Sequence, residues 1–181
     1  MILPTLGKLS VAQALTAGAV ASTNQIKEAA IIGLGATDIW LSIEVSTVAA
    51  ASGSSSTYTF SLRIATTTAL TTYKEVCSVL VGTGADGATD ERLLTAGKRI
   101  AAFNIGKMLP QLIREFKAEQ SLADTAFVYI GIMNTLANGN GTAQLSVNSA
   151  LSITEPPTES ERMITESNTG VPTIASAGSG L

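Results

Sequence analysis

The sequence predicts an all-β protein, an antiparallel β-sandwich or barrel of about eight strands, and three observations support this. Apolar and polar residues alternate with a period of two over several segments, which is typical of strands with one buried face. Stretches rich in Gly, Ser, Asn and Thr separate these segments at the spacing of a sandwich or barrel. Apolar residues make up 45% of the 181 residues, enough for one proper core.

The alternation is clearest in residues 38–48 and 57–66. Apolar side chains occupy positions 39, 41, 43 and 45 of the first segment and positions 58, 60, 62 and 64 of the second. We therefore expect Phe60 and Leu62 in the core and Arg63 exposed. The polar connection Ala49–Ser56 predicts that the two strands pair as a hairpin.

A second hairpin is predicted near the end of the domain. Residues 125–133 are rich in β-forming side chains, and residues 143–153 place apolar side chains on one face. Between them lies Asn138–Gly141, with the sequence Asn-Gly-Asn-Gly, which readily adopts the positive φ angles of tight turns. These features favour an antiparallel pair joined by that turn.

The middle of the chain supplies the other expected strands: Tyr73–Val81, Ile100–Ile105 and a shorter one within residues 23–32. Residues 107–120 admit two interpretations. Pro110 excludes a regular central strand, so we favour a strand-like or irregular edge. The alternative is a short helix, because four apolar residues fall at helical spacing: Leu109, Leu112, Ile113 and Phe116.

These elements divide the chain into three parts. Residues 22–153 form the predicted β domain, and residues 1–21, small and weakly periodic, are expected to be an N-terminal arm. Residues 154–181 show no period and consist largely of Thr, Ser, Gly, Pro and Glu, which predicts an extended C-terminal arm. We expect this arm to lie across a neighbouring subunit, anchored by isolated apolar residues: Met163, Ile164, Val171 and Ile174.

Charge and composition limit the possible partners. Only 14% of residues are charged, so the surface is largely neutral and costs less free energy to desolvate against a neighbouring protein. The net charge of −3, with eleven basic residues spread along the chain, argues against nucleic acid. No apolar stretch is long enough for a membrane span, and Ala19-Val20-Ala21 lacks an apolar segment before it, so we expect neither membrane nor export.

The side chains available for catalysis argue against an enzyme. The chain has no histidine, which removes Ser-His and Cys-His pairs and the commonest general base. Cys77 is the single cysteine, so it forms no intrachain disulfide, and its apolar neighbours predict an ordinary thiol. We expect no catalytic residue, no cofactor and no metal.

Four weaker patterns in the sequence offer alternatives to that expectation. Gly82–Gly87 matches the dinucleotide fingerprint G-x-G-x-x-G, but the preceding strand alternates and no acidic residue stands about twenty positions on, so we interpret it as a loop. The carboxylates of Asp86, Asp90 and Glu91 suit calcium but match no EF-hand spacing. Asn140–Thr142 fits a glycosylation sequon within the predicted turn. Glu44 and Glu75 are candidates for a carboxylate pair whose spatial separation the sequence does not reveal.

Several short motifs of the chain are similar to those of one known family. They are Met1-Ile2-Leu3, Leu9–Ala14 (LSVAQA), Ala21–Asn24 (ASTN), Leu93–Gly97 (LLTAG) and Phe127–Gly131 (FVYIG). Over about residues 1–153 the chain resembles the jelly-roll cement proteins of tailed phages, typified by the cement protein of a Bordetella podophage. Residues 107–120 are more helical and charged than that pattern, and the tail from Thr154 is an addition.

The resemblance implies a jelly roll that self-associates as a dimer or trimer and contacts several major capsid subunits. It implies a cement, or decoration, protein on the outside of a virion, made in the cytoplasm of the bacterial host, and it transfers no catalytic or ligand residues. The alternatives are another virion β-domain, such as a fibre or baseplate part, and a carbohydrate-binding jelly-roll module. The latter requires exposed aromatic residues, and most of the eight aromatics occupy positions predicted to face inward.

Overall fold

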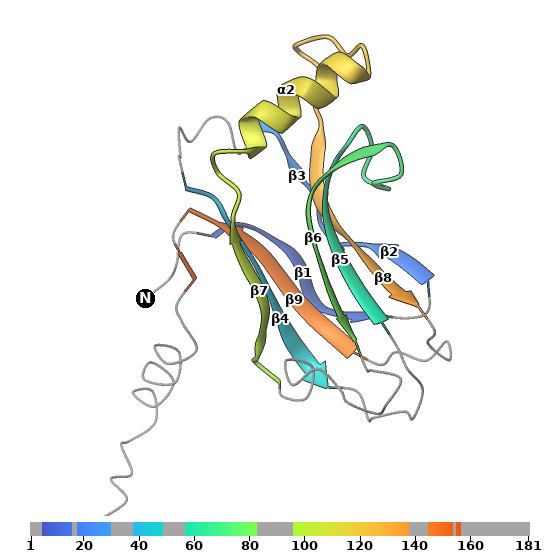
Figure 1. Ribbon diagram of the computed structural model, residues 1–181, viewed down its shortest axis with the longest axis vertical. Coiled ribbons are helices and arrows are strands. Elements are labelled where there is room, and N and C mark those ends of the chain that lie inside the picture. Colours follow the sequence, from blue (N-terminus) through green and yellow to red (C-terminus); the bar gives the residue numbers. More distant parts are fainter. Residues whose placement is uncertain are drawn as a thin grey trace, which may run out of the picture.

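The computed structural model describes residues 5–15, 18–29, 38–48, 57–82, 96–137, 145–153 and 155–156. These residues form nine strands and one helix (Figure 1). The strands are β1 (Thr5–Leu15), β2 (Gly18–Ala21), β3 (Ile26–Lys27), β4 (Trp40–Val48), β5 (Thr57–Ala65), β6 (Tyr73–Gly82), β7 (Arg99–Asn104), β8 (Tyr129–Ala137) and β9 (Leu145–Ser152); the helix is α2 (Leu109–Glu119). The predicted all-β fold class is confirmed.

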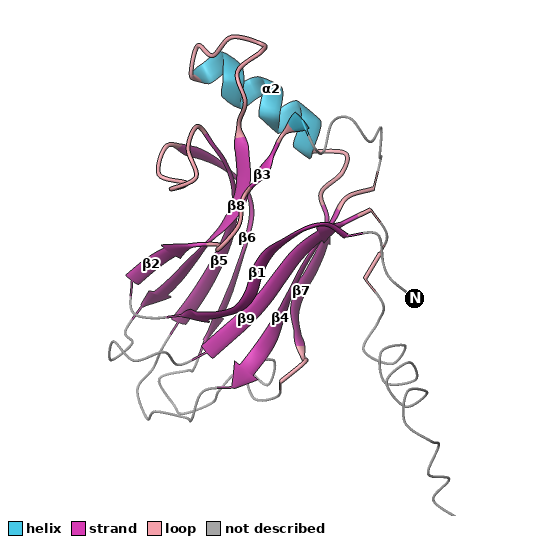
Figure 2. Cartoon of the chain, turned by 180° about the vertical axis from the view of Figure 1, so that it is seen from behind, coloured by secondary structure: helices cyan, strands magenta, loops and turns pink. Residues whose placement is uncertain are grey.

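The strands form two antiparallel sheets that pack face to face (Figure 2). The four-stranded sheet has the order β1-β9-β4-β7. The five-stranded sheet has the order β2-β8-β5-β6, with β3 also paired to β8. Early and late strands interleave in both sheets, which is the double Greek-key arrangement of a jelly roll. The predicted sandwich is therefore confirmed, and its strand order is that of a jelly roll.

Alternate side chains of both sheets build the core between them. Phe60 and Leu62 on β5 are fully buried, as predicted. Further buried side chains come from β1, β4, β8 and β9: Leu9, Leu15, Leu41, Ile43, Ile130, Ile132, Val147 and Leu151. The helix α2 covers one end of the sandwich (Figure 1) and buries Leu109, Ile113 and Phe116.

Arg63 is half-buried, so the prediction that it is exposed is wrong. The loop after β5 turns back over the outer face of the five-stranded sheet, and the Arg63 guanidinium donates hydrogen bonds to the Leu70 carbonyl (3.1 Å) and to Ser61 Oγ (3.2 Å). It also lies 3.6 Å from the centre of the Tyr73 ring. Alternation along one strand does not reveal a loop that folds over its polar face.

The same loop creates a second, smaller apolar cluster on that outer face. Leu70 is fully buried there against Ala65 and Met133. Close approach requires Gly131 beneath it, because a Cβ atom at this position would lie 3.0 Å from atoms of both Leu70 and Ser22. The chain therefore covers part of the outer face of its own five-stranded sheet.

Both predicted hairpins are wrong. β4 lies in the four-stranded sheet and β5 in the five-stranded sheet, so their connection passes from one sheet to the other. The same holds for β8 and β9, whose neighbours in the sheets are β5 and β4 respectively. Period and turn residues indicate which face of a strand is buried but not which strand lies beside it. Residues 138–144, which contain the predicted turn, lie outside the described residues.

The N-terminal arm predicted for residues 1–21 is also wrong where the structure describes it. β1 pairs with β9 and β2 pairs with β8, so both belong to the sandwich. β1 has register shifts after Thr5, Lys8 and Ser10, and these bulges disrupt the period of two that would have identified a strand. The described residues before residue 22 are therefore part of the β domain.

Residues 109–119 form the helix α2, so the favoured strand-like interpretation of this segment is wrong. Pro110 lies in the first helical turn, where a missing N–H costs nothing because it has no intrahelical acceptor. β6 and β7 confirm two predicted strands. Of the strand expected within residues 23–32, the described residues 23–29 contain the two residues of β3, and residues 30–32 lie outside the described part. The predicted C-terminal arm lies outside the described residues, apart from Glu155 and Pro156.

Candidate functional site

The candidate carboxylates lie in different sheets, so the structure does not bring Glu44 and Glu75 together as a catalytic pair. Glu44 on β4 lies 3.5 Å from Asn148 Nδ2. Glu75 on β6 accepts hydrogen bonds from the hydroxyls of Ser61 and Ser78. Each carboxylate is therefore engaged within its own sheet.

Cys77 is a half-buried thiol on β6, as the sequence predicted. Burial, with a smaller contribution from the negative charge of Glu75, raises the pKa of this thiol to about 11. The thiol is consequently protonated at neutral pH and a poor nucleophile.

The other candidate motifs lie outside the described residues. They are the glycine motif after Gly82, the carboxylates of Asp86, Asp90 and Glu91, and the sequon Asn140–Thr142. Within the residues that the structure describes, no three His, Cys, Asp or Glu side chains gather into a group that could hold a metal ion. No helix in this part of the chain is long and apolar enough to span a membrane.

The outer face of the four-stranded sheet is built mainly from small, uncharged side chains. Because Leu41 and Leu151 point into the core, their neighbours Ser42 and Ala150 point outward. Ala102, Asn104, Ser146 and Asn148 occupy equivalent outward positions. The charged residues on the strands of this face are Lys8, Glu44 and Arg99. Asp38, just before β4, accepts a hydrogen bond from Asn104 (2.8 Å), and Trp40 also occupies an outward position. The face can therefore be covered by another protein at a small cost in charge desolvation.

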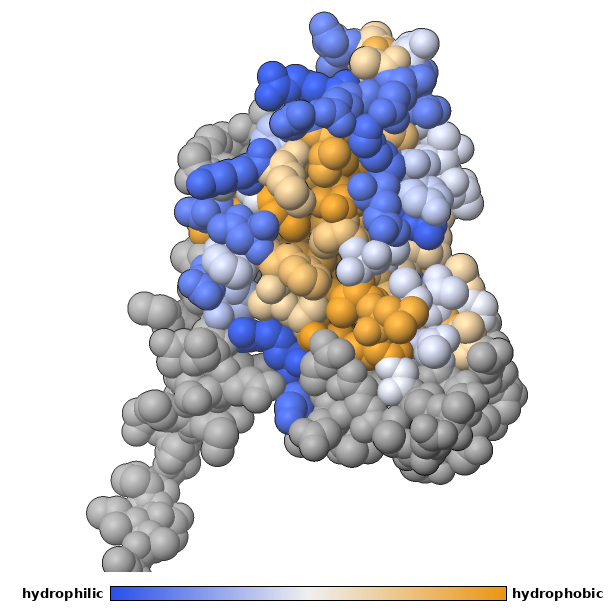
Figure 3. Space-filling view, viewed as in Figure 1, coloured by the Kyte–Doolittle hydropathy of each residue, from blue (hydrophilic) through white to orange (hydrophobic). Residues whose placement is uncertain are grey.

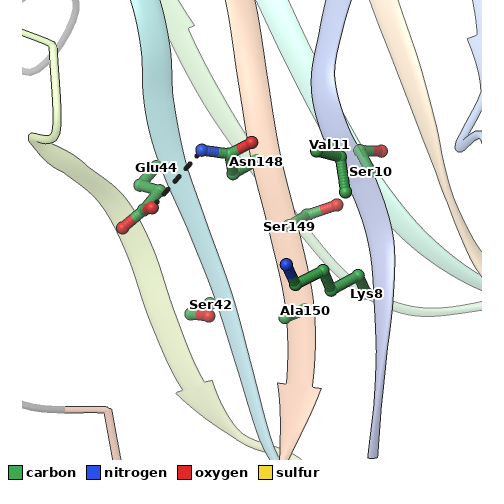
Figure 4. Close-up of a pocket in the computed structure, with 8 residues that line it drawn as sticks. All are labelled: Lys8, Ser10, Val11, Ser42, Glu44, Asn148, Ser149 and Ala150. Atoms are coloured by element: carbon green, nitrogen blue, oxygen red, sulfur yellow. Dashed lines mark hydrogen bonds between the residues drawn. The ribbon is translucent and has the colours of Figure 1, made fainter. Parts of the chain in front are cut away.

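A shallow depression of about 280 Å³ lies in this face between β1, β9 and β4 (Figure 4). Its lining residues are Lys8, Ser10, Val11, Ser42, Glu44, Asn148, Ser149 and Ala150. Figure 4 shows the longer side chains of Lys8, Glu44 and Asn148 around the small side chains of Ser42 and Ala150. Asn148 Oδ1 accepts a hydrogen bond from the Ala12 amide (2.8 Å). Ala12 lies in a bulge of β1 and has a φ of 46°, so this bond stabilises the bulge.

A second hollow, of about 350 Å³, lies beside the end of α2 and is lined in part by Glu28, Lys117, Asp124 and Phe127. Lys117 Nζ lies 2.8 Å from Glu28 Oε2 and donates to the Asp124 carbonyl at 3.1 Å. Both side chains of the ion pair are about nine-tenths buried. The charges neutralise one another and fasten α2 to the segment that follows β3.

Exposed aromatic residues offer little surface for stacking on sugars. Among the described residues, Tyr73 and Phe127 are the aromatics with large exposure. The Arg63 guanidinium covers the Tyr73 ring, and Lys27 Nζ lies 5.6 Å from the centre of the Phe127 ring. No aromatic residue lines the depression on the four-stranded sheet.

The two open edges of the sandwich differ in the contacts that their strands make. On one edge, the segment after β2 caps β1: the Asn24 amide donates to the Leu9 carbonyl (2.8 Å) and Asn24 Nδ2 donates to the Lys8 carbonyl (3.2 Å). On the other edge lie β6 and β7, which face the viewer in Figure 1. Figure 3 shows an apolar strip on this side, below α2. Partly buried Val76, Cys77, Val79 and Phe103, with exposed Leu80, supply apolar side chains here.

No protein-family model matches the chain, and no curated protein matches its sequence. The outer face of the four-stranded sheet and the β6 edge were not identified from the sequence. The alternation of small and apolar residues in β4 and β9 was a signal for that outer face, but locating it required the strand order.

Proposed function

We propose that the chain is a structural virion protein, a cement or decoration protein that binds the outer surface of a tailed-phage capsid and bridges major capsid subunits. The jelly-roll strand order and the resemblance of short motifs to phage cement proteins support this proposal. Two of those motifs, Leu9–Ala14 and Phe127–Gly131, fall on or next to strands of the fold, in β1 and at the start of β8.

The observation that carries the proposal is the broad outer face of the four-stranded sheet. Ser42, Ala102, Ala150 and their neighbours give it mostly small, uncharged side chains, and no aromatic residue lines its depression. Few charged groups lose their contact with water when such a face is buried against a capsid subunit, so the desolvation cost is small. A catalytic or sugar-binding site would instead concentrate polar or aromatic side chains in a deeper pocket.

The mechanism follows from mass-action linkage. A protein that spans neighbouring capsid subunits makes its contacts only when these subunits have the mature arrangement, so binding stabilises that arrangement. At a concentration of 100 times the dissociation constant, one such site contributes about 2.7 kcal/mol. Many copies on one shell then resist swelling or internal pressure together.

The test is binding to purified, undecorated capsids of the phage that encodes the chain. Ala150→Glu and Ala150→Lys place a charge of either sign at the centre of the outer face. We expect each variant to bind at least about tenfold more weakly, because the new charge must be desolvated. The matched control is Thr68→Glu, in the exposed loop on the other sheet.

Thermal melts verify that each variant remains folded, and co-sedimentation with capsids measures binding. The control should bind like the unmodified protein. The proposal fails if the unmodified protein does not bind capsids, and the assignment of this face fails if both Ala150 variants bind with undiminished affinity.

A further inference from the structure

The strand β6 is an unusually uncharged sheet edge. It runs over ten residues and pairs with β5; within the described residues no strand lies on its other side. The stretch Val76–Gly82, with the sequence VCSVLVG, contains no charged residue. Leu80 in this stretch is 65% exposed, which is the largest exposed fraction among the large apolar side chains of the described residues.

Features that discourage a sheet edge from pairing with another chain occur only in the first half of β6. Lys74 and Glu75 are charged, and a β-bulge follows, because Leu62 pairs with Cys77 whereas Arg63 pairs with Glu75. Charged residues and bulges are the features by which proteins prevent a sheet edge from pairing with another chain. The second half of the strand, from Cys77 onward, has neither feature.

The opposite edge of the sandwich is protected in a different way. The Gln13 side chain donates to the Ala21 carbonyl (2.7 Å) and accepts from the Thr23 amide (3.3 Å). Asn24 bonds the carbonyls of Lys8 and Leu9. These four backbone groups are therefore used within the chain, whereas no corresponding side-chain bonds to the β6 backbone occur among the described residues.

Side chains at the β6 edge offer an apolar contact in addition to backbone hydrogen bonds. Val79 and Cys77 point inward at the open side of the sandwich, since they pair with the core residues Phe60 and Leu62. Phe103 on β7 is also only partly buried. The apolar strip in Figure 3 lies on this side of the molecule. A strand added at β6 would extend the sheet and cover part of this strip.

We propose that the occupant of this edge is a second copy of the chain, and that two copies join antiparallel through β6 about a twofold axis. An antiparallel strand facing its own copy makes a closed, isologous contact in which the same residues meet twice. The absence of charge from Val76 to Gly82 means that no like charges are placed opposite one another.

One register pairs the whole uncharged stretch with itself. Centred on Val79, it places Val79 opposite its counterpart, Ser78 opposite Leu80 of the partner subunit and Cys77 opposite Val81 of the partner subunit. Leu80 and Ser78 both lie on the outer face, and Cys77 and Val81 both lie on the inner face, so the pairing respects the alternation of each strand. Lys74 and Glu75 fall beyond the paired residues.

This inference specifies the surface and symmetry of the self-association that the proposed function includes, but it rests on the β6 edge itself. It is tested on the purified chain without capsids, so its failure leaves the capsid proposal standing. Failure of the capsid proposal likewise leaves this inference standing, because a dimer in solution does not require capsid binding.

The experiment compares two double variants by sedimentation equilibrium. Combining Ser78→Lys with Leu80→Lys places lysine opposite lysine twice in the proposed register. Combining Ser78→Glu with Leu80→Lys loses the same leucine but places glutamate opposite lysine twice. We expect the first pair to raise the dimer dissociation constant at least about 100-fold, through lost apolar burial and like-charge repulsion, and the second pair to recover much of the affinity.

The control is Val11→Lys, since Val11 is an exposed valine on the protected edge and its change should leave the dimer intact. Both Ser78 and Leu80 point to solvent in the monomer, so thermal melts should show that all variants fold. The proposal is overturned if the unmodified chain stays monomeric at high micromolar concentration, or if the lysine pair leaves the dimer unchanged. Equal weakening by both double variants would also overturn it, because the register would then be wrong.

Discussion

The two edges of this sandwich differ in whether they are protected from pairing with a strand of another chain. The β1 edge is irregular, with three register shifts, and amide side chains of Gln13 and Asn24 bond the backbone beside it. The β6 edge carries a single bulge near its start and then continues as an uncharged, apolar strand. The difference indicates that one edge is closed within the chain and that the other is suited to pairing with another strand.

The largest expected effect concerns the core that both edges flank. Phe60 is almost fully buried on β5, next to β6, whereas Leu80 on β6 is mostly exposed. Phe60→Ala should lower the free energy of unfolding by about 3–5 kcal/mol, a loss typical of buried aromatic residues. Leu80→Ala should change it by less than about 0.5 kcal/mol in the monomer. Urea unfolding of both variants at low protein concentration measures the contrast, and similar losses would show that β6 is not an exposed edge.

The second prediction concerns the ion pairs of α2, one of which is largely buried. The Lys117–Glu28 pair is largely buried, whereas Glu115 and Glu119, which contact Lys74, are about half exposed. Lys117→Met should lower the free energy of unfolding by about 3 kcal/mol, because it leaves the Glu28 carboxylate buried without its partner. Combining it with Glu28→Gln should recover part of that loss. A double variant less stable than the single one would contradict this account.

The third prediction concerns the protection of the β1 edge. Gln13 bonds the Ala21 carbonyl, the Thr23 amide and the Ser10 hydroxyl, so Gln13→Ala leaves several partly buried groups without partners. We expect a loss of about 1–3 kcal/mol in the free energy of unfolding. Amide hydrogen exchange should also become faster at Thr23, since its backbone N–H loses its acceptor. Unchanged exchange there would show that the side chain does not protect this edge.

The smallest expected effect is at Glu115 of α2, whose carboxylate lies 3.1 Å from the ammonium group of Lys74 near the start of β6. A hydrogen bond from Gln111 and the contact with Lys74 lower the pKa of Glu115 below its ordinary value. Such a group stabilises the fold at pH values above its unfolded pKa of about 4.3, and the contribution is lost as the pH falls through the lower folded pKa.

The difference in melting temperature between the unmodified protein and Glu115→Gln should therefore vanish below that pH range. It should also shrink at high salt, because the pair is exposed. A difference that persists at pH 2 would mean that Glu115 acts through packing rather than charge.

The strands themselves followed from the sequence where side chains alternate without interruption, as in β4 and β5. Their pairing did not, because alternation specifies a buried face and the connections here pass between sheets. β1 was mistaken for an arm because its bulges interrupt the period. Pro110 was interpreted as a feature of an irregular edge, although a proline in the first turn is equally suited to beginning a helix.

The candidate surfaces could not be predicted from the sequence, because they depend on the order of the strands. The absence of histidine and the lone Cys77 argue against nucleophilic catalysis, but they identify no contact surface. The outer face of Ser42 and Ala150 exists only because β4 and β9 are neighbours. The exposed edge at Leu80 exists only because β6 is the last strand of its sheet.

A cryo-EM map of the purified virus particle tests the central claim most directly, since it locates the chain and both of its proposed contacts. The account predicts jelly-roll density on the outside of the capsid, with the outer face of the four-stranded sheet against capsid subunits. It also predicts pairs of copies related by twofold axes that pass between adjacent β6 strands. Density for this chain in the tail or baseplate, or a capsid shell without it, would contradict the account.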